Sequence, residues 1–520
     1  MHAGPDAPVQ LAEVVAALSL ATDFGTGHPI ERSLRSCLLA VAFGEAIGLR
    51  DAELHELFYV TLLRWVGCTA DPHRAQLFGD EIALGPQIDA VELWNAPAML
   101  AFLLEHIGKG EPPFQRVGKL GHALATGIQR SQTAAVAHCE VGQTVAQELG
   151  LHAGVCRALG QVFERWDGKG VPGEAKGEAL ALSTRIMQIA MDAELFYRLG
   201  GAATALTVVR DRAGGFYDPS LAERFCRVAP GLLSLLDEET VWDRALAAEP
   251  GPSRTLSSSD VDAALGAIAD FGDLRLPFTT GHSRAVAALA ADAAKRAGLS
   301  EDEVWLSWAA GLVHDVGMVT ISITVIQKPS VLTPLEIERV RLHPYYTERI
   351  LVRTAGLTRV GALAALHHER LDASGYHRRL PGALLPPAAR LLAAAEVNQA
   401  LIEPRPHRPA FPPERASTLL IAEANAGRMD GDAVRAVLAA AGFALPRQRR
   451  TQPAGLSERE VEVLHLIVCG LSKREMAARL VISERTVDHH VRHIYDKLGV
   501  SSRAAATMFA MRHGIAAADL

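Results

Sequence analysis

The sequence has few cysteines and few aromatic residues, and it has no long apolar run. Six cysteines are scattered through 520 residues without the spacing of a metal or redox motif, so we expect reduced, buried thiols rather than disulfides. No stretch approaches about eighteen uninterrupted apolar residues, which excludes a membrane-spanning helix. The start of the chain lacks a basic segment followed by an apolar run, so no signal peptide is expected. These absences favour a cytoplasmic protein.

The chain also lacks an excess of positive charge. Its formal net charge of −7 excludes a protein that coats nucleic acid over its whole surface, so any DNA contact must be local. Strand-like alternation is scarce and the composition is rich in Ala and Leu, which predicts an all-α fold. Turn-rich, aperiodic segments at 246–259 and 445–454 predict three domains, at 1–245, 260–444 and 455–520.

The last domain contains three closely spaced helix starts. Ser457 with Glu460 and Ser472 with Glu475 have the Ser-x-x-Glu spacing of a capping box, in which the two side chains satisfy free backbone donors at a helix start. Ser483 can cap a third helix, and Gly499 stands where that helix should end. The spacing therefore predicts a compact helical module with short connections.

The third helix of this module has two different faces. Its apolar residues recur at helical spacing and predict one buried face: Val487, Val491, Ile494 and Leu498. Its other face is polar and rich in donors: Arg485, Asp488, His489, Arg492, His493 and, near the end, Lys497. Such a helix suits the major groove of DNA. The same pattern would also suit a small helical bundle with a solvated charged face.

The segment 455–515 resembles the LuxR-type helix-turn-helix. The resemblance rests on Leu-Ser-Glu-Arg-Glu at 456–460, Gly-Leu-Ser at 470–472, Ile-Ser-Glu-Arg-Thr-Val at 482–487 and Lys-Leu-Gly-Val at 497–500. It implies a four-helix domain in which Thr486 and Lys497 hold phosphates. It further implies that base edges or the flanking backbone are contacted by Lys473, Ser483, Arg485, Asp488, His489 and Arg492. A carboxylate at Asp488 can accept from a cytosine amino group and would narrow specificity.

The module carries almost no net positive charge, and this affects the oligomeric state in which we expect it to bind DNA. Residues 451–520 hold nine Lys or Arg against eight Asp or Glu, so one copy should bind DNA weakly and with strong salt dependence. Two copies on a two-fold site would bind more tightly. We therefore expect a homodimer on promoter DNA.

The middle domain holds an unusual set of histidines. Five of them fall on the expected helices, and one is followed by an aspartate: His282, His314-Asp315, His343, His367 and His368. Imidazole and carboxylate are natural ligands of divalent first-row metals. A lone histidine is more often structural than a ligand, but a carboxylate next to a histidine can bridge two ions. Two such ions would deprotonate a water and hold the oxygens of a phosphodiester.

Residues 275–410 resemble the HD-GYP branch of the HD superfamily of phosphohydrolases. The matching segments are His-Asp-Val-Gly at 314–317, His-Pro at 343–344, His-His-Glu-Arg at 367–370 and Gly-Tyr at 375–376. The resemblance implies a helical domain that hydrolyses cyclic di-GMP or a related cyclic dinucleotide at a site with two metals, iron or manganese. The implied ligands are His282, His314, Asp315, His343, His367, His368 and Glu396. Asp315 would bridge the two ions and would also be the catalytic residue.

Several positions depart from the family's pattern. Glu396 replaces an aspartate and is longer by one methylene, roughly 1.5 Å. Met318 replaces a lysine whose ammonium would lie beside the scissile phosphate, and loss of such a charge typically costs about a hundred- to a thousandfold in rate. His377 replaces the proline of the Gly-Tyr-Pro signature, and Ala373 replaces a glycine. The expected ligands are thus largely present, whereas the substrate-gripping residues have changed.

Residues 1–245 repeat the same pattern with most of the ligands gone. Phe-Glu-Arg-Trp-Asp-Gly-Lys-Gly-Val-Pro at 163–172 resembles the HD-GYP signature, and Glu164 lies 26 positions after His138, just as Glu369 lies 26 positions after His343. We matched Gly27-His28 with Gly281-His282. Arg64-Trp65, Val162-Phe163 and Met191 then stand at ligand positions. This predicts a degenerate lobe that holds no metal pair and has a sensory or dimerising role, or acts as a folding scaffold.

Three functions remain compatible with the sequence. The first is a DNA-binding transcriptional regulator whose HD-GYP-like lobes sense or process a phosphorylated ligand such as a cyclic dinucleotide. The second is a metal-dependent cyclic di-GMP phosphodiesterase with an accessory DNA-binding domain. The third is an inert scaffold that binds no metal. Met318 argues against the enzyme, and the histidine set argues for it.

Overall fold

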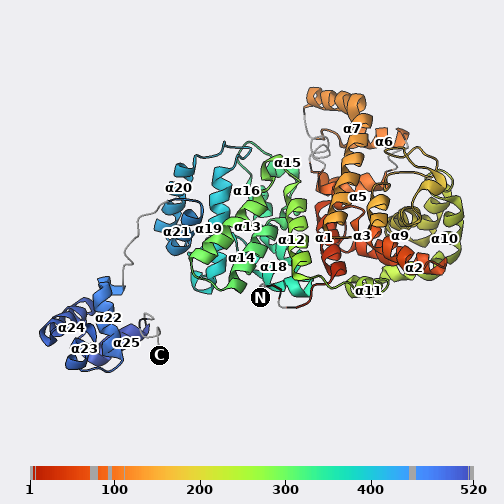
Figure 1. Ribbon diagram of the computed structural model, residues 1–520. Helices are drawn as coiled ribbons and strands as arrows, with labels where there is room; N and C mark the ends of the chain where they lie inside the picture. Colours follow the sequence, from red (N-terminus) through yellow and green to blue (C-terminus); the bar gives the residue numbers. More distant parts are fainter. Residues whose placement is uncertain are drawn as a thin grey trace. The chain divides into compact units, whose positions relative to one another are not determined.

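A computed structural model describes residues 4–5, 7–70, 80–91, 96–109, 112–443, 453–512 and 515. These residues form helices and turns with a few isolated β-bridges, so the all-α prediction is confirmed (Figure 1). The chain divides into two compact units, Met1–Phe443 and Ala444–Leu520. Of the segment 445–454 that we expected to be a linker, residues 445–452 lie outside the described residues.

Among the described residues, the N-terminal lobe comprises ten α-helices, labelled up to α11, and three short 3-10 turns. They are α1 (Leu11–Gly25), α2 (Arg32–Ala46), α3 (Ala52–Leu63), η1 (Val66–Ala70), α5 (Glu81–Ala90), α6 (Ala96–His106), α7 (Pro113–Glu148), α8 (Ala153–Leu159), η2 (Gly177–Ala179), α9 (Leu182–Asp211), α10 (Pro219–Leu232), η3 (Leu233–Asp237) and α11 (Trp242–Ala247). Helix α1 is apolar and buried on nearly all sides, as expected for a central helix. Helix α9 is interrupted at Gly200 and Gly201, whose backbone angles are not helical.

The middle lobe repeats this order. It comprises α12 (Ser258–Asp273), η4 (Pro277–Thr279), α13 (His282–Arg296), α14 (Glu301–Val313), η5 (Val316–Thr320), α15 (Ile323–Ile326), α16 (Pro334–Arg341), α17 (His343–Leu351), η6 (Ala355–Leu357), α18 (Thr358–Ala364), η7 (Gly382–Leu384), α19 (Pro387–Ile402), α20 (Pro413–Asn425) and α21 (Gly431–Ala440). Capping boxes begin three of its helices, α12, α14 and α16.

The two lobes share the same local hydrogen bonds. The backbone N–H of Ser33 donates to Asp23 at 3.1 Å, and that of Ser283 donates to Asp273 at 3.0 Å. These bonds fix the starts of α2 and α13, whose first residues are Arg32 and His282. The residue that corresponds to His282 is therefore Arg32. Our match of His28 with His282 was wrong, because sequence similarity placed the glycine of the two turns in register instead of the helix starts.

A close backbone approach is also repeated. A Cβ atom on Gly317 would lie 2.1 Å from the carbonyl oxygen of His343, and one on Gly67 would lie 2.3 Å from that of His138. Only glycine permits this packing of η5 against α17, and of η1 against α7. The repeat thus extends from the sequence to the packing of each lobe's centre.

The lobes pack against each other inside the first unit. Helix α1 contacts η5 and α17 of the middle lobe, and α12 contacts α7 of the N-terminal lobe (Figure 1). Phe24 and Tyr346 meet edge to face with ring centroids 5.3 Å apart. The turn-rich segment 246–259 runs along the start of the chain, where the N–H of Leu256 donates to the carbonyl of Val9 at 2.9 Å.

The second unit is a four-helix module. Its elements are η8 (Pro453–Gly455), α22 (Glu458–Val468), α23 (Lys473–Leu480), α24 (Glu484–Leu498) and α25 (Arg503–Arg512). Both predicted capping boxes are present, the Ser483 hydroxyl accepts from the N–H of Thr486, and Gly499 ends α24 with a φ of 65°. Val487 and Ile494 are buried in the module's core. The predicted helix starts are confirmed, and so is the apolar face of α24, on which Val491 and Leu498 pack against this core but are only partly buried.

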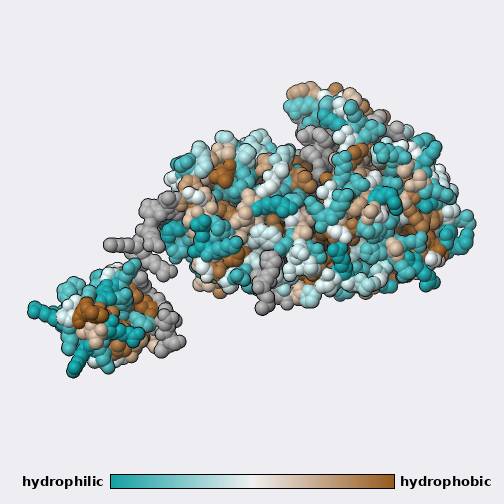
Figure 2. Space-filling model, in the orientation of Figure 1, coloured by the Kyte–Doolittle hydropathy of each residue, from teal (hydrophilic) through white to brown (hydrophobic). Residues whose placement is uncertain are grey.

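Hydrophilic residues cover most of the face seen in Figure 2, with smaller hydrophobic areas between them. Among the described residues, no helix is both long and apolar enough to cross a bilayer. None of the six cysteines, all of which lie among the described residues, forms a disulfide. Cys37, Cys139 and Cys156 are buried as expected, but Cys469 is exposed because it lies at the solvent side of the end of α22.

Candidate metal centre and DNA-binding helix

The seven predicted metal ligands come together in the middle lobe. His282 and His343 are the first residues of α13 and α17, and Glu396 lies within α19. His314 directly follows α14, and the pair His367-His368 lies in the turn after α18. The expectation that all five histidines lie on helices was therefore wrong. The turns carry three of them, because a turn can aim neighbouring side chains in directions that one helix cannot.

Three of the histidines are oriented by the carbonyl three residues earlier. The Nδ1 atom of His314 lies 2.7 Å from the Gly311 oxygen, that of His343 lies 2.6 Å from the Val340 oxygen, and that of His367 lies 2.6 Å from the Ala364 oxygen. A neutral ring that donates from Nδ1 to a carbonyl keeps a lone pair on Nε2. Each of the three Nε2 atoms is thereby prepared as a ligand, as outer hydrogen bonds prepare metal-bound histidines.

Asp315 lies between two groups of ligands. Its Oδ1 is 3.2 Å from His343 Nε2 and 3.5 Å from His367 Nε2, whereas its Oδ2 is 3.6 Å from His314 Nε2. Glu396 Oε2 completes the second group, at 2.9 Å from His282 Nε2 and 3.3 Å from His314 Nε2. One carboxylate thus has one oxygen directed to each group, which is the arrangement of a bridging ligand.

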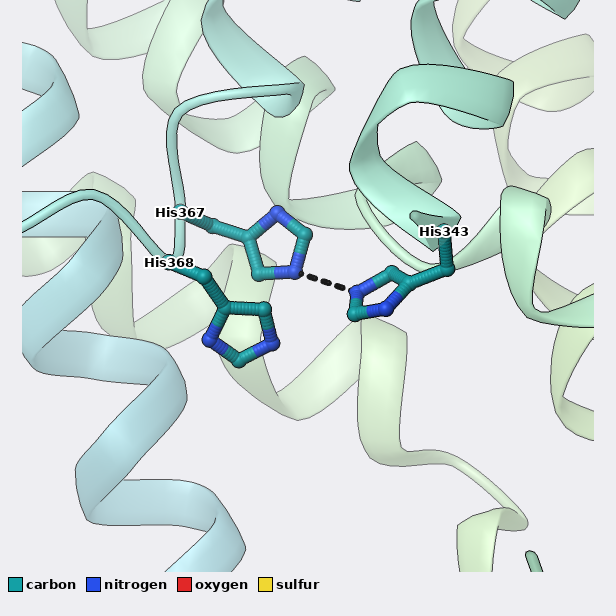
Figure 3. A group of neighbouring side chains, drawn as sticks. All are labelled: His343, His367 and His368. Carbon is teal, nitrogen blue, oxygen red and sulfur yellow. Dashed lines mark hydrogen bonds between the residues drawn. The ribbon is translucent and has the colours of Figure 1, made fainter. Parts of the chain in front are cut away.

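The geometry fits cations better than hydrogen bonds. His343 and His367 bring their Nε2 atoms within 3.0 Å of each other, and His368 lies beside them (Figure 3). With both Nδ1 atoms donating to carbonyls, this contact would set two lone pairs against each other. The contacts of His282 Nε2 and His314 Nε2 with Glu396 Oε2 lack hydrogen-bond geometry, so in the described structure these three buried atoms have no hydrogen-bond partner. A positive ion in each group would satisfy all of these atoms.

Two groups have ligand atoms close enough for one ion each. They are His343 with His367 and His368, and His282 with His314 and Asp315. Imidazole and carboxylate donors of this kind suit Mn, Fe or Zn rather than Ca or Mg. The residues present therefore fit a pair of divalent transition-metal ions.

The residues of the cluster shift one another's pKa values, and the carboxyl groups and the imidazoles are affected differently. Burial opposes ionisation of Asp315 and Glu396, but the neighbouring histidines outweigh it and hold both pKa values well below the usual range. Burial also disfavours charge on His282, yet Glu396, Glu403 and Asp315 raise its pKa to about 11. Burial lowers the pKa of His367 to about 4, so that this ring stays neutral. Both carboxylates are therefore ready ligands at neutral pH.

The sequence reasoning gave no role to three residues near the cluster. Glu403 Oε2 lies 2.8 Å from His282 Nδ1 and orients that ring. Glu403 is seven positions after Glu396, which is two helical turns, so the spacing could have revealed it. Tyr376 packs on His368 with ring centroids 4.1 Å apart, and the Arg341 guanidinium carbon lies 5.9 Å from the Tyr376 ring.

The residues that depart from the family's pattern lie next to the cluster. Met318 follows Asp315 in η5, where its N–H donates to the Asp315 carbonyl at 2.8 Å and its side chain is partly buried. It offers no charge in place of the family's lysine. His377 follows Tyr376 and packs near Tyr345, with ring centroids 6.1 Å apart.

The N-terminal lobe fills the same positions with other chemistry. When the two lobes are aligned by the starts of their helices, the counterparts of the seven ligands are Arg32, Arg64, Trp65, His138, Val162, Phe163 and Met191. The Arg64 guanidinium carbon lies 4.1 Å from the centroid of the Trp65 ring and 4.2 Å from that of the Phe163 ring. His138 Nε2 lies 2.6 Å from the Arg64 carbonyl oxygen, so it donates where His343 offers a lone pair. This centre therefore already contains cations.

In the C-terminal module, most of the residues predicted to contact DNA lie on α24. Arg485, His489 and Arg492 are exposed, and the rings of His489 and His493 lie 4.1 Å apart. Asp488 accepts from Lys473 and, at 2.6 Å, from Arg492, so it neutralises two of the expected DNA-contacting cations in the free protein. The hydroxyls of Ser483 and Thr486 lie 2.8 Å apart at the start of the helix.

Lys497 has a structural partner that the sequence did not reveal. Its Nζ lies 2.6 Å from Glu460 Oε2 and 3.1 Å from the Gly455 carbonyl oxygen. Burial opposes ionisation of Glu460, but Lys497 and the Ser457 N–H lower its pKa to about 2. The expected phosphate contact of Lys497 therefore competes with an ion pair that holds α22 against α24.

Comparison with known families agrees with this architecture. A model of the HD domain family matches residues 83–221 and 267–433, and a model described as bacterial regulatory proteins, luxR family, matches residues 454–510. The tandem repeat and the C-terminal helix-turn-helix are thus both found, and the chain carries an HD domain and a LuxR-type module.

Known proteins resemble different parts of the chain. A 3'3'-cGAMP-specific phosphodiesterase 3 of Vibrio cholerae is 29% identical over 416 residues, which is 79% of this chain and 90% of that protein. The crystal structure of a cyclic GMP-AMP specific phosphodiesterase from V. cholerae covers 85% of this chain and 99% of its own, with 25% identity and a TM-score of 0.58. A probable transcriptional regulatory protein NarL of Mycobacterium tuberculosis is 52% identical over 67 residues, which is 13% of this chain and 31% of that protein.

Proposed function

The chain belongs to the HD domain family, and on that premise we propose that it is a DNA-binding regulator whose middle lobe holds two divalent metal ions and hydrolyses a cyclic dinucleotide. The observation that carries this proposal is the convergence of three Nε2 lone pairs and two ionised carboxylates on a buried centre. Relatives that act on cyclic dinucleotides support the substrate class. The luxR-family module supports the DNA partner.

The ligands would divide between two ions. His282, His314 and Glu396 would hold the first ion, and Asp315 would bridge to the second ion, held by His343, His367 and His368. Iron or manganese suits this donor set. Bound there, the ions would supply a deprotonated water near neutral pH and would stabilise the charge on the phosphodiester oxygens.

The chain's own residues would prepare the site for the substrate. The carbonyls of Gly311, Val340 and Ala364 hold the imidazoles in one tautomer, so that no reorganisation is needed when ions bind. Glu403 fixes the His282 ring in the same way. Tyr376 covers His368 with an aromatic face, and Arg341 beside it adds a positive charge suited to a nucleotide phosphate.

One observation favours a second function, which is binding without turnover. Met318 provides no ammonium group next to the cluster, and loss of such a group typically costs about a hundred- to a thousandfold in rate. A lobe that binds the nucleotide and cleaves it slowly would act as a sensor, and its occupied and empty forms would differ in affinity for DNA.

One experiment on the full chain distinguishes the enzyme from the sensor. The protein is purified without oxygen, loaded with Mn²⁺ or Fe²⁺, and incubated with 3'3'-cGAMP and with cyclic di-GMP. Multiple turnovers that disappear in the His314→Ala, Asp315→Ala double variant support the enzyme. Saturable nucleotide binding without product supports the sensor, and neither binding nor product would refute both.

DNA binding is tested on α24, and we propose that the protein binds its promoter site as a homodimer. If Arg492 and His489 read bases, replacing either with Ala should cost about 1–3 kcal/mol at particular base pairs. Equal losses on every sequence would contradict base reading. Lys497→Ala is a poor test of phosphate contact, because it also leaves the Glu460 carboxylate unpaired. Arg485→Ala has no such side effect on that ion pair and is the better probe.

A further inference from the structure

A carboxylate of the N-terminal lobe reaches the segment that follows the His-Asp pair of the middle lobe. Glu81 is the first residue of α5. Its Oε1 accepts from Arg275 Nη2 at 2.9 Å and from the N–H of Ile323 at 2.7 Å, and its Oε2 accepts from the Ser322 hydroxyl at 2.6 Å. One side chain thus satisfies three donors of the other lobe.

Arg275 carries this contact to the turn beside the metal ligands. Its side chain is 3% exposed, and that of Glu81 is 9% exposed, so water screens their ion pair little. The second nitrogen of the guanidinium, Nη1, donates to the carbonyl of Val319 and, at 3.3 Å, to that of Met318. Both carbonyls belong to η5, the turn that begins one residue after Asp315.

The turn η5 is connected in the same way to the ligands themselves. The N–H of Met318 donates to the Asp315 carbonyl at 2.8 Å. The N–H of Gly317 donates to the Thr347 hydroxyl at 3.0 Å, and that hydroxyl donates to the His314 carbonyl at 2.8 Å. A displacement of η5 would therefore move the backbone that orients the His-Asp pair.

The other side of α5 is fixed to the N-terminal lobe. A Cβ atom on Gly85 would lie 1.9 Å from the Thr26 carbonyl oxygen, and one on Gly27 would lie 1.9 Å from the Ile82 carbonyl oxygen. Helix α5 is thus in close backbone contact with the turn at 26–27. That turn leads into α2, whose first residue is Arg32, the counterpart of His282.

We propose that Glu81 is a positioning residue through which the lobe without metal ligands sets the geometry of the metal site in the other lobe. The inference rests on the proposed metal-dependent function of residues 260–444. It gives the degenerate lobe a definite role, because the turn at 26–27 leads along the chain to Arg32 at the centre of that lobe and contacts α5, whose Glu81 is linked through Arg275 to η5. Removal of a hydrogen bond made directly to a metal ligand typically changes metal affinity about 10- to 100-fold, and because Glu81 acts on the ligands through Arg275 and η5, we expect the lower end of that range.

The test uses the full chain and three variants. Glu81→Ala should weaken Mn²⁺ binding at least about tenfold and should lower kcat more than it changes KM, because the ligands lose their alignment. Glu81→Gln should fall between Glu81→Ala and the wild type, because its amide oxygen can still accept from Ile323. The matched control is Asp80→Asn, since Asp80 precedes Glu81, is 38% exposed and pairs at 3.2 Å with Arg339 on α16 instead of with η5. It should stay within about twofold of the wild type.

Metal affinity is measured by competition with a chromophoric chelator, and folding is checked by circular dichroism and thermal unfolding. If Glu81→Ala and Glu81→Gln are folded and bind Mn²⁺ as tightly as the wild type, the inference is overturned and the proposed function stays in place. A loss of affinity in Asp80→Asn equal to that in Glu81→Gln also overturns it, because the effect would then be general destabilisation. A wild-type chain that binds no Mn²⁺ refutes the proposed function itself.

Discussion

The two lobes of the first unit share the same helical framework, but the residues at their centres differ in charge. Asp23 with Ser33 and Asp273 with Ser283 make the same bonds at the same helix start. In the middle lobe that helix begins with a histidine whose Nε2 faces two carboxylates, and in the N-terminal lobe it begins with an arginine. The comparison teaches that this fold does not need a metal ion to close its centre.

Each centre is balanced by a different cation. The middle lobe gathers imidazoles around two ionised carboxylates, and under the proposed function it would take metal cations from solution. The N-terminal lobe carries its cations on the chain: Arg64 is stacked between Trp65 and Phe163, and Arg32 lies 3.8 Å from Glu194. A divalent ion placed there would be repelled by two guanidinium groups, which do not lose their proton in proteins.

The largest expected difference is in metal content. Asp315→Ala should remove all bound metal, because it deletes the carboxylate that serves both groups of ligands. Trp65→Ala makes the matching change in the other lobe and should leave the metal content unchanged. Elemental analysis of both variants, purified without oxygen, measures the effect. Metal retained in Asp315→Ala, or lost in a folded Trp65→Ala, would break the comparison.

A gain of function should follow when the family's lysine is restored. Met318→Lys places an ammonium next to the cluster and should raise kcat for the cyclic dinucleotide about 100-fold. Cys68→Lys makes the same change at the corresponding place in η1 and should have no effect on kcat. Initial rates at saturating substrate measure both. An unchanged rate in Met318→Lys would show that the missing charge does not limit turnover.

Metal binding should depend on pH, and this dependence should arise from the middle lobe alone. The carboxylates around His282 raise its pKa to about 11, although burial opposes this, so below that pH the ring carries a proton that the metal must displace. Mn²⁺ affinity should therefore rise with pH, about tenfold per unit for one displaced proton. Calorimetric titrations between pH 6.5 and 8.5, in buffers of different ionisation enthalpy, measure the proton release. A flat profile would mean that His282 is not a ligand.

The smallest expected effect is on thermal stability. Metal at about a hundredfold above its Kd should stabilise the folded chain by about 2.7 kcal/mol, which a chelator would remove. We expect the Tm of the wild type and of Trp65→Ala to fall by roughly 2–4 °C in EDTA. The Tm of Asp315→Ala should not change. A chelator effect in that variant would point to a metal site elsewhere.

Much of the architecture could be predicted from the sequence because its signals are local. Capping boxes and helical periodicity predicted the starts of α22, α23 and α24 and the buried face of α24. The spacing from His343 to Glu369 revealed the repeat, because the frame requires the same distance in both lobes. The structure also brings together the seven residues expected to hold metal.

The rest depended on contacts between distant segments. Arg32 could not be recognised as the counterpart of His282, because the helix start is defined by a bond to Asp23 and the nearby Gly27-His28 resembles Gly281-His282. The pairing of Lys497 with Glu460 spans 37 positions and has no local signal. The contact of Glu81 with Arg275 spans 194 positions, and nothing in either segment alone predicts it.

The central claim is that only one of the two lobes is a metal centre. Crystals of the full chain, purified without oxygen and loaded with Mn²⁺, would show the ions directly by anomalous scattering at the manganese edge. We predict two peaks, one beside His282 and His314 and one beside His343 and His367, joined by Asp315. A peak beside Arg64 and Trp65, or no peak in the middle lobe, would contradict the account.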